Sequence, residues 1–317
     1  SLTTGDPRLA GAEMVRNIVV PLDGSALAER ALPPAEALAR AAGARLLLVR
    51  VVTDDGGSVA GGSDAREYLD GIARASHERG VEATTAVLSG EAAAAIVDEA
   101  RRQGADLIAM ATHGRGGLGR WVYGSVAEAV LARATAPTLL VRAWQAGHGP
   151  APLRPGGRLL VPLDGSDFAE EALPVATGLA DTLGGEIVLL RAVARSDLPF
   201  GPDAILAPLL QRELDEERAQ AEDYLRRVAE RFAREGRAVR TEVRVGRPDL
   251  EMAAGVIESV GREYSAALVV MASHRYTGMN RLLLGSVADG VVRHGTLPLL
   301  LVRPQGQGEA RSGTPER

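Results

Sequence analysis

The chain of 317 residues contains no cysteine and no lysine. Without cysteine there is no disulfide, no thiolate zinc site and no cysteine nucleophile. All 36 basic residues are arginine. The absence of lysine excludes a Walker-type phosphate loop and Schiff-base chemistry, because each needs a lysine amine.

Aromatic residues are also scarce, at 3%, so aliphatic side chains must build the cores. The formal net charge is −5 and no long basic run occurs, which argues against a nucleic-acid surface. No apolar run approaches the roughly 20 residues that span a bilayer, so no membrane segment is expected. The composition fits a cytoplasmic protein.

An internal repeat governs the organisation of the chain. The motif VPLDGS, which ends at Ser25, recurs and ends at Ser166. YGSVA at Tyr123–Ala127 likewise matches LGSVA at Leu284–Ala288. Because the landmarks keep their order, the sequence indicates a tandem duplication with extra residues in the second half.

Each half alternates near-continuous apolar runs with segments of helical periodicity. Strands are predicted in the first half at residues 17–22, 45–52, 82–88, 106–111 and 137–142, with helices at 26–42, 63–79, 91–103 and 125–134. In the second half, strands are predicted at residues 158–163, 186–193, 238–245, 267–272 and 298–303, with a long charged helix near 209–235. This pattern predicts an α/β fold of two tandem Rossmann-like domains, each a five-stranded parallel sheet covered by helices on both faces.

The predicted domains span residues 14–145 and 158–304, joined by a proline-rich linker at 146–157. The polar residues 305–317 are expected to form a disordered tail.

The first candidate site feature is Asp23, which directly follows the first strand. In a doubly wound sheet, ligands bind beyond the carboxyl ends of the strands where the strand order reverses. A carboxylate there is placed to accept hydrogen bonds from a ribose. Ser25 is a second candidate, although it is equally suited to capping the helix that follows.

The second candidate feature is the glycine-rich segment that follows the fourth strand, with four glycines at positions 114–119. A glycine-rich loop that runs into a helix presents backbone N–H groups and a helix N-terminus, which together favour phosphate. Ser125 adds a hydroxyl at the helix start. An ordinary flexible loop is the alternative, but so many glycines are entropically costly without a reason for close backbone approach.

Each half resembles a domain of the universal stress protein family, and the whole chain resembles its tandem-domain members. The phosphate-loop pattern of the ATP-binding branch falls on Ala111, Gly114, Gly124 and Ser125, with alanine in place of the first glycine. The resemblance implies adenine near Val51 and Pro21, ribose near Asp23, and phosphates on the loop and on the Val126 amide. It also allows magnesium or manganese to bridge the phosphates. Leu22 and Arg115 complete the expected ATP-binding residues.

In the second half, the matching residues are Pro162, Asp164, Ala192, Gly285, Ser286 and Val287. Arg275, however, stands where the first half has Gly114. Arginine is strained wherever φ must be positive, and its side chain either fills the phosphate space or pairs with phosphate. The second site is therefore either degenerate or an altered ATP site.

Three functions are compatible with these residues. The first is an ATP-binding stress-response or signalling protein that acts through nucleotide-dependent conformation. The second is a slow ATPase, since no general base is evident at the loop, and the third is a nucleotide-free interaction scaffold. The resemblance further implies that Pro137–Arg142 and Pro298–Arg303 pair within the chain to form a pseudo-dimer, and whole chains could dimerise in addition.

Overall fold

The computed structural model describes residues 15–52, 59–112, 124–142, 153–194, 207–246, 252–273, 276–278 and 281–303. The elements of the first half are β1 (Asn17–Pro21), the 3-10 helix η2 (Ala28–Ala31), α1 (Leu32–Ala42), β2 (Arg45–Val52), α2 (Val59–Glu78), β3 (Ala83–Ser89), α3 (Ala92–Arg102), β4 (Leu107–Thr112), α4 (Ser125–Arg133) and β5 (Thr138–Arg142). All five predicted strands of this half are confirmed.

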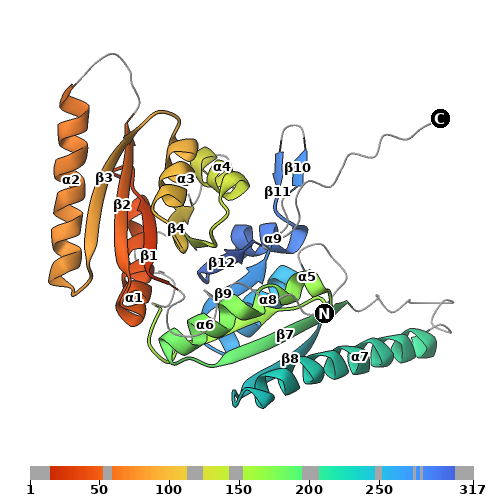
Figure 1. Ribbon diagram of the computed structural model, residues 1–317. Coiled ribbons are helices and arrows are strands. Elements are labelled where there is room, and N and C mark those ends of the chain that lie inside the picture. Colours follow the sequence, from red (N-terminus) through yellow and green to blue (C-terminus); the bar gives the residue numbers. More distant parts are fainter. Residues whose placement is uncertain are drawn as a thin grey trace, which may run out of the picture.

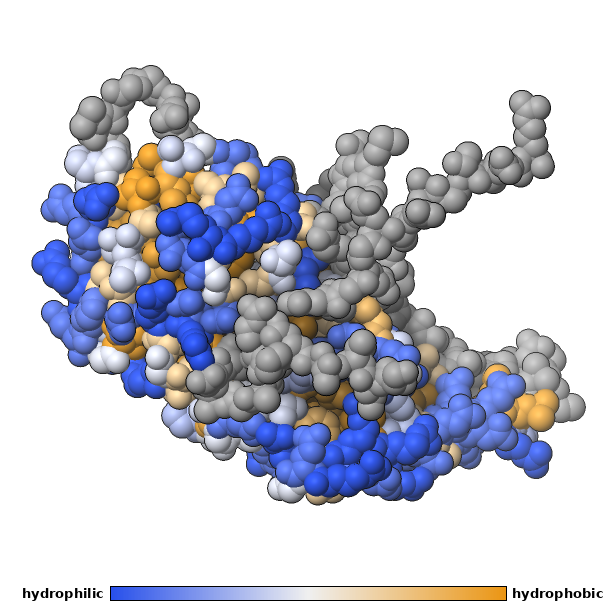
Figure 2. Space-filling model, viewed as in Figure 1, coloured by the Kyte–Doolittle hydropathy of each residue, from blue (hydrophilic) through white to orange (hydrophobic). Residues whose placement is uncertain are grey.

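The second half repeats this order. Its elements are β6 (Arg158–Pro162), α5 (Asp167–Glu170), α6 (Leu173–Leu183), β7 (Ile187–Ala194), α7 (Ala207–Arg234), β8 (Val239–Gly246), α8 (Met252–Glu263), β9 (Ala266–Ala272), β10 (Tyr276–Gly278), β11 (Arg281–Leu283), α9 (Ser286–His294) and β12 (Leu299–Val302). The long predicted helix is α7, whose visible surface is largely hydrophilic (Figure 2).

Two local expectations were wrong. The single helix predicted over residues 26–42 is broken into η2 and α1, because prolines 33 and 34 fit the first turn of a helix and not its interior. The segment after β9 corresponds to the glycine-rich loop of the first half, and by that correspondence it was also expected to be a loop. It contains instead an antiparallel hairpin, β10–β11, in which Tyr276 pairs with Leu283.

Within the described residues, every strand outside this hairpin joins one ten-stranded sheet, in the order β3-β2-β1-β4-β5-β12-β9-β6-β7-β8 (Figure 1). Neighbouring strands within each half are parallel, as predicted. Between the halves, β5 pairs antiparallel with β12, with Leu140 opposite Leu299. The expected pseudo-dimer is thereby confirmed, and two sheet edges that would otherwise be exposed are closed.

Successive side chains along each strand point to opposite faces of the sheet, and the buried ones form two separate cores, one on each face. Ile18 and Val20 of β1 pack into one core, and Val19 packs into the other. Buried residues of α1, α2, α6 and α7 belong to the first core, and those of α3, α4, α8 and α9 belong to the second. Both cores contain residues from both halves, so the duplicated units share their interior.

Arg142, the last residue of β5, connects the halves. Its side chain lies in the interface, the residue is only 8% exposed, and Nη1 donates a 2.6 Å hydrogen bond to the carbonyl of Gly295, which follows α9. Burial lowers the pKa of the guanidinium, and the nearby carboxylate of Glu258 acts in the opposite direction. A cation at a helix C-terminus is electrostatically favourable.

No helix among the described residues is long and apolar enough to cross a membrane.

Candidate functional site

A cavity of about 340 Å³ opens at the carboxyl edge of β1, β2 and β4. It lies between the sheet and helices α3 and α4, beside β1, where the strand order reverses. The predicted site residues that line it are Pro21, Leu22, Asp23, Val51, Ala111, Gly124, Ser125 and Val126. The structure therefore brings together residues from three separate parts of the sequence.

The sequence reasoning missed the apolar walls of this cavity. Met110 contributes from β4, Ile96 from α3, and Leu27 from the segment after β1. Their periodicity marks them only as core residues, so no sequence signal separates them from the rest of the interior.

Asp23 begins a tight turn after β1. Its Oδ1 accepts a 2.8 Å hydrogen bond from the amide of Ser25. The Ser25 hydroxyl in turn accepts a 3.1 Å hydrogen bond from the amide of Ala28. Ser25 therefore acts as a local cap and is not among the residues that line the cavity. Its assignment as a cofactor ligand stays a prediction.

Helix α4 points its N-terminus at the cavity. Gly124 is the N-cap residue and supplies no side chain to the first amides of the helix. Such amides carry partial positive charge and need an acceptor. Together with the Ser125 hydroxyl, they form an anion-binding feature beside the Asp23 carboxylate.

Behind the Asp23 turn lies a cluster made of Arg50, Tyr68 and Glu29. The Arg50 guanidinium is 5.3 Å from the centroid of the Tyr68 ring, and the Tyr68 hydroxyl donates a 2.8 Å hydrogen bond to Glu29. Burial is the main reason that the pKa of Tyr68 is raised. Gly24, with φ of +89°, leaves room for the guanidinium: a Cβ there would lie 3.3 Å from Arg50 Nη1.

The second half repeats this supporting cluster with Arg191, Tyr224 and Glu170. Gly165 has φ of +86° above Arg191, and the Tyr224 hydroxyl donates a 3.0 Å hydrogen bond to Glu170. The turn that carries each aspartate is therefore held in the same way in both halves.

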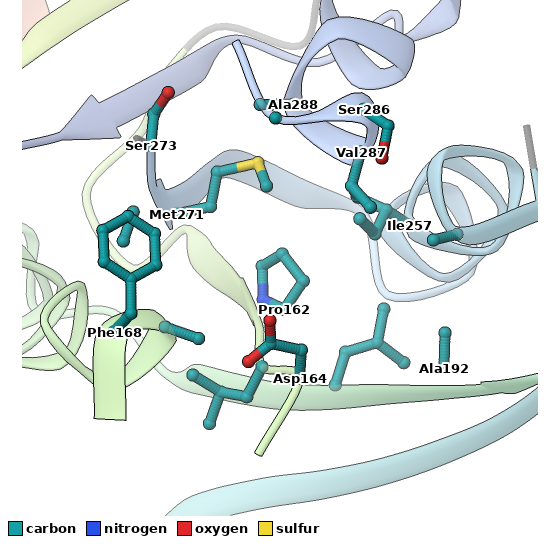
Figure 3. A pocket seen from close by; sticks show the side chains of 16 residues that line it. Pro162, Asp164, Phe168, Ala192, Ile257, Met271, Ser273, Ser286, Val287 and Ala288 are labelled. Atoms are coloured by element: carbon teal, nitrogen blue, oxygen red, sulfur yellow. The ribbon is translucent and has the colours of Figure 1, made fainter. Parts of the chain in front are cut away.

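The second half also has its own cavity, of about 260 Å³, at the corresponding place (Figure 3). All the predicted residues of the second site line it, namely Pro162, Asp164, Ala192, Gly285, Ser286 and Val287. Residues that sequence reasoning missed there include Phe168, Met271 and Ser273. Gly114, Arg115 and Arg275 lie outside the described residues.

The start of α3, which borders the first cavity, is capped by Glu91. The Glu91 carboxylate accepts hydrogen bonds from the amides of Ala94 (2.8 Å) and Ala93 (3.1 Å), and from Arg133 (2.6 Å). These hydrogen bonds lower the pKa of Glu91. The bond from the Ala94 amide contributes most, and the bond from Arg133 is the next largest contribution.

This capping predicts a pH dependence. A carboxyl whose pKa is depressed on folding stabilises the fold above its ordinary pKa, and the stabilisation is lost as pH falls through the lowered value. The wild-type chain should therefore be more stable than Glu91→Gln at neutral pH, and its advantage should shrink below about pH 5. Urea unfolding at stepped pH measures this. Glu67→Gln, on the exposed face of α2, is the control, and a pH-independent advantage for wild type would contradict the assignment.

Among the described residues, no group of three His, Cys, Asp or Glu side chains is placed to hold a metal ion.

Two doubly wound halves that share one sheet, each with a cavity at its switch point, define a tandem Rossmann-like α/β protein. The model of the universal stress protein family matches residues 14–142 and again 157–303. The chain belongs to the universal stress protein family.

Individual relatives agree with this assignment. A universal stress protein of Methanocaldococcus jannaschii is 34% identical over 146 residues, which cover 46% of this chain and 81% of the relative. One from Mycobacterium tuberculosis is 29% identical over 210 residues, covering 63% of this chain and 62% of the relative. The fold is also that of a universal stress protein from Archaeoglobus fulgidus, with a TM-score of 0.67 and 20% identity over 90% of this chain and 98% of that chain.

Proposed function

We propose that the first cavity binds ATP and that its occupancy sets the conformation through which the protein acts in stress response or signalling. The observation that carries the proposal is the convergence, among the described residues of one cavity, of apolar walls, the Asp23 carboxylate and the N-terminus of α4. These are the three chemistries that a base, a ribose and a phosphate chain require.

The adenine ring fits the apolar part of the cavity. Val51, Pro21 and Met110 offer flat aliphatic surface, which favours burial of an uncharged ring. Asp23, which is exposed at the cavity rim, is placed to accept hydrogen bonds from ribose hydroxyls.

The phosphates fit the start of α4. The amides of Ser125 and Val126 and the Ser125 hydroxyl lie at the cavity, and a helix N-terminus attracts anions. Magnesium or manganese would arrive bound to the phosphates, since the described residues offer no cluster of acidic or histidine side chains to hold it.

Asp23 is the only titratable side chain among the described residues that line this cavity. A site with one carboxylate already engaged by the Ser25 amide is better suited to holding a nucleotide than to activating water. Hydrolysis is therefore expected to be slow, below about 1 s⁻¹.

Isothermal titration of the full chain with Mg·ATP tests the proposal. We expect binding with micromolar affinity and a loss of about tenfold or more in Asp23→Ala, the cost of a hydrogen bond to a charged group. Asp164→Ala, the same change at the matching turn of the second half, is the control and should bind ATP through the first cavity as wild type does. The absence of binding below millimolar ATP, or equal affinity in wild type and Asp23→Ala, would overturn the proposed ATP site and favour a nucleotide-free scaffold.

A further inference from the structure

A further cavity, of about 310 Å³, lies at the amino edge of the first half, between strands β1, β2 and β3 and the C-terminal part of α3. It is separate from the proposed ATP site, which opens at the opposite ends of β1 and β2 and borders the start of α3. Its size is at the lower end of the range for small-molecule sites. We call it the amino-edge cavity, and the polar residues that decide its chemistry are Asn17, Arg45, Thr84, Glu99, Arg102 and Gln103.

A buried carboxylate holds one side of this cavity in place. Glu99 of α3 is 5% exposed and accepts hydrogen bonds from Arg102 Nε (2.8 Å) and Nη2 (2.5 Å) and from Gln103 Nε2 (2.9 Å). A bidentate pair of arginine and carboxylate has a defined geometry. The Arg102 guanidinium is therefore fixed at the cavity wall, and its charge is balanced by Glu99.

Arg45 carries the charge that no lining residue balances. Its Nε donates a 2.6 Å hydrogen bond to Asn17 Oδ1, which orients the guanidinium. Among the described residues, its two terminal nitrogens donate no hydrogen bond and pair with no carboxylate. The charged residues that line the described part of the cavity are Arg45, Arg102 and Glu99, so the lining has one surplus positive charge. A guanidinium with open N–H groups is suited to a planar anion.

The amino edge of the second half is built on the same plan. In the first half, the side-chain amide of Asn17 donates a hydrogen bond to the Gln103 carbonyl (3.3 Å). In the second half, Arg158 replaces Asn17 in the repeat and donates to the carbonyl of Tyr264 (2.9 Å), which follows α8 as Gln103 follows α3. Because the two regions share this contact, their other residues can be compared position by position.

In the second half, a carboxylate of the protein itself neutralises the arginines at this edge. The strand register places Glu186 at the position of Arg45. Glu186 accepts hydrogen bonds from Arg158 (2.9 Å) and from Arg240 (2.6 Å). The first half has the reverse arrangement, because an arginine stands at this position and the described residues supply no carboxylate for it.

The second half also fills space that the first half leaves open. Glu242 stands at the position of Ala86 and accepts a 2.5 Å hydrogen bond from the Tyr264 hydroxyl. In the first half the corresponding residues are Ala86 and Gln103, and the Gln103 side chain bonds to Glu99 instead. A carboxylate and an aromatic ring are therefore missing from the first half at the place where the cavity lies.

We propose that the amino-edge cavity binds a small organic molecule that carries a carboxylate group. The carboxylate accepts hydrogen bonds from the terminal nitrogens of Arg45, and the rest of the molecule occupies the space beside Ala86. Other polar groups of the ligand find the Thr84 hydroxyl and the Arg102 guanidinium in the same lining. A carboxylate is favoured over a phosphate because the second half places carboxylates here. The inference is independent of the proposed ATP site, since the two cavities share no lining residue among those described.

Titration of the full chain with acetate, succinate and glutarate tests the inference, with succinamide as the uncharged counterpart of succinate. The chain is first saturated with ATP, so that these anions cannot enter the first cavity, and the titration is repeated without ATP. We expect succinate or glutarate to bind once per chain and succinamide not to bind. Arg45→Gln should weaken the binding by about tenfold or more, as expected for the loss of charge-assisted hydrogen bonds.

Two further variants complete the design. Ala86→Glu gives the first half the carboxylate that the second half has, so it should abolish binding of the dicarboxylates. Arg240→Gln removes an arginine at the amino edge of the second half that is already paired with Glu186, so it should leave binding unchanged. Circular dichroism melts verify that the three variants are folded.

The outcomes separate this inference from the proposed function. If none of the three carboxylates binds below millimolar concentration, or if succinamide binds as well as succinate, the inference is overturned while the ATP site stands. Binding that survives both Arg45→Gln and Ala86→Glu would also overturn it. Inorganic phosphate that binds more tightly than succinate would overturn the class of ligand. If ATP fails to bind but succinate binds in an Arg45-dependent manner, the inference holds and the proposed function fails.

Discussion

Replacing Arg142 with alanine should lower the free energy of unfolding of the whole chain by about 2–4 kcal/mol, the range for loss of a buried, charge-assisted hydrogen bond. The guanidinium is buried between the halves and satisfies the Gly295 carbonyl at the end of α9. Alanine leaves that carbonyl without the donor and removes a favourable charge from a helix C-terminus. Urea denaturation followed by circular dichroism measures the change.

Arg101→Ala is the matched control for this prediction. Arg101 also donates to a carbonyl at a helix C-terminus, that of Arg133 at 3.1 Å, but its side chain is 53% exposed. Solvent replaces an exposed bond at little cost, so this variant should lose no more than about 1 kcal/mol. Equal losses of unfolding free energy in the two variants would show that burial at the interface adds nothing to the stabilisation by Arg142.

Replacing Ser125 with aspartate should weaken ATP binding by about 100-fold or more and leave the fold intact. The new carboxylate would stand at the start of α4, where it repels a phosphate chain by a few kcal/mol at close range. Negative charge at a helix N-terminus stabilises the helix, so the melting temperature should not fall. Loss of binding with unchanged or raised stability distinguishes a lost ligand contact from a damaged fold.

Ser286→Asp places the same charge at the start of α9 and serves as the control. If the first cavity alone holds the triphosphate, this variant binds ATP as wild type does. Equal weakening by the two substitutions would mean that both helix N-termini contact phosphate.

Much of the architecture follows from local sequence. The recurrence of VPLDGS and the alternation of apolar runs with helical segments predict the strands and the duplication, because the buried parallel strands are nearly continuous in hydrophobicity. Aspartates 23 and 164 line the two cavities, since the carboxyl ends of parallel strands gather at one edge, and their role as ligand-binding residues stays a prediction.

One feature that the sequence analysis missed could have been predicted from local sequence, and the others could not. The break between η2 and α1 could have been read from Pro33 and Pro34. The β10–β11 hairpin could not, because three-residue strands carry no periodicity. Two further features depend on segments that meet only in the folded chain. They are the position of Phe168 in the wall of the second cavity and the hydrogen bond from Arg142 to Gly295.

The antiparallel pairing of β5 with β12 determines where the two cavities lie relative to each other. Because the strand direction reverses at the joint, the carboxyl edges of the two halves lie at opposite rims of the ten-stranded sheet. Both cavities nevertheless open on the side covered by α3, α4, α8 and α9. A protein docked at one rim would therefore contact one cavity only. To contact both at once it would have to lie across the helices that cover this face of the sheet.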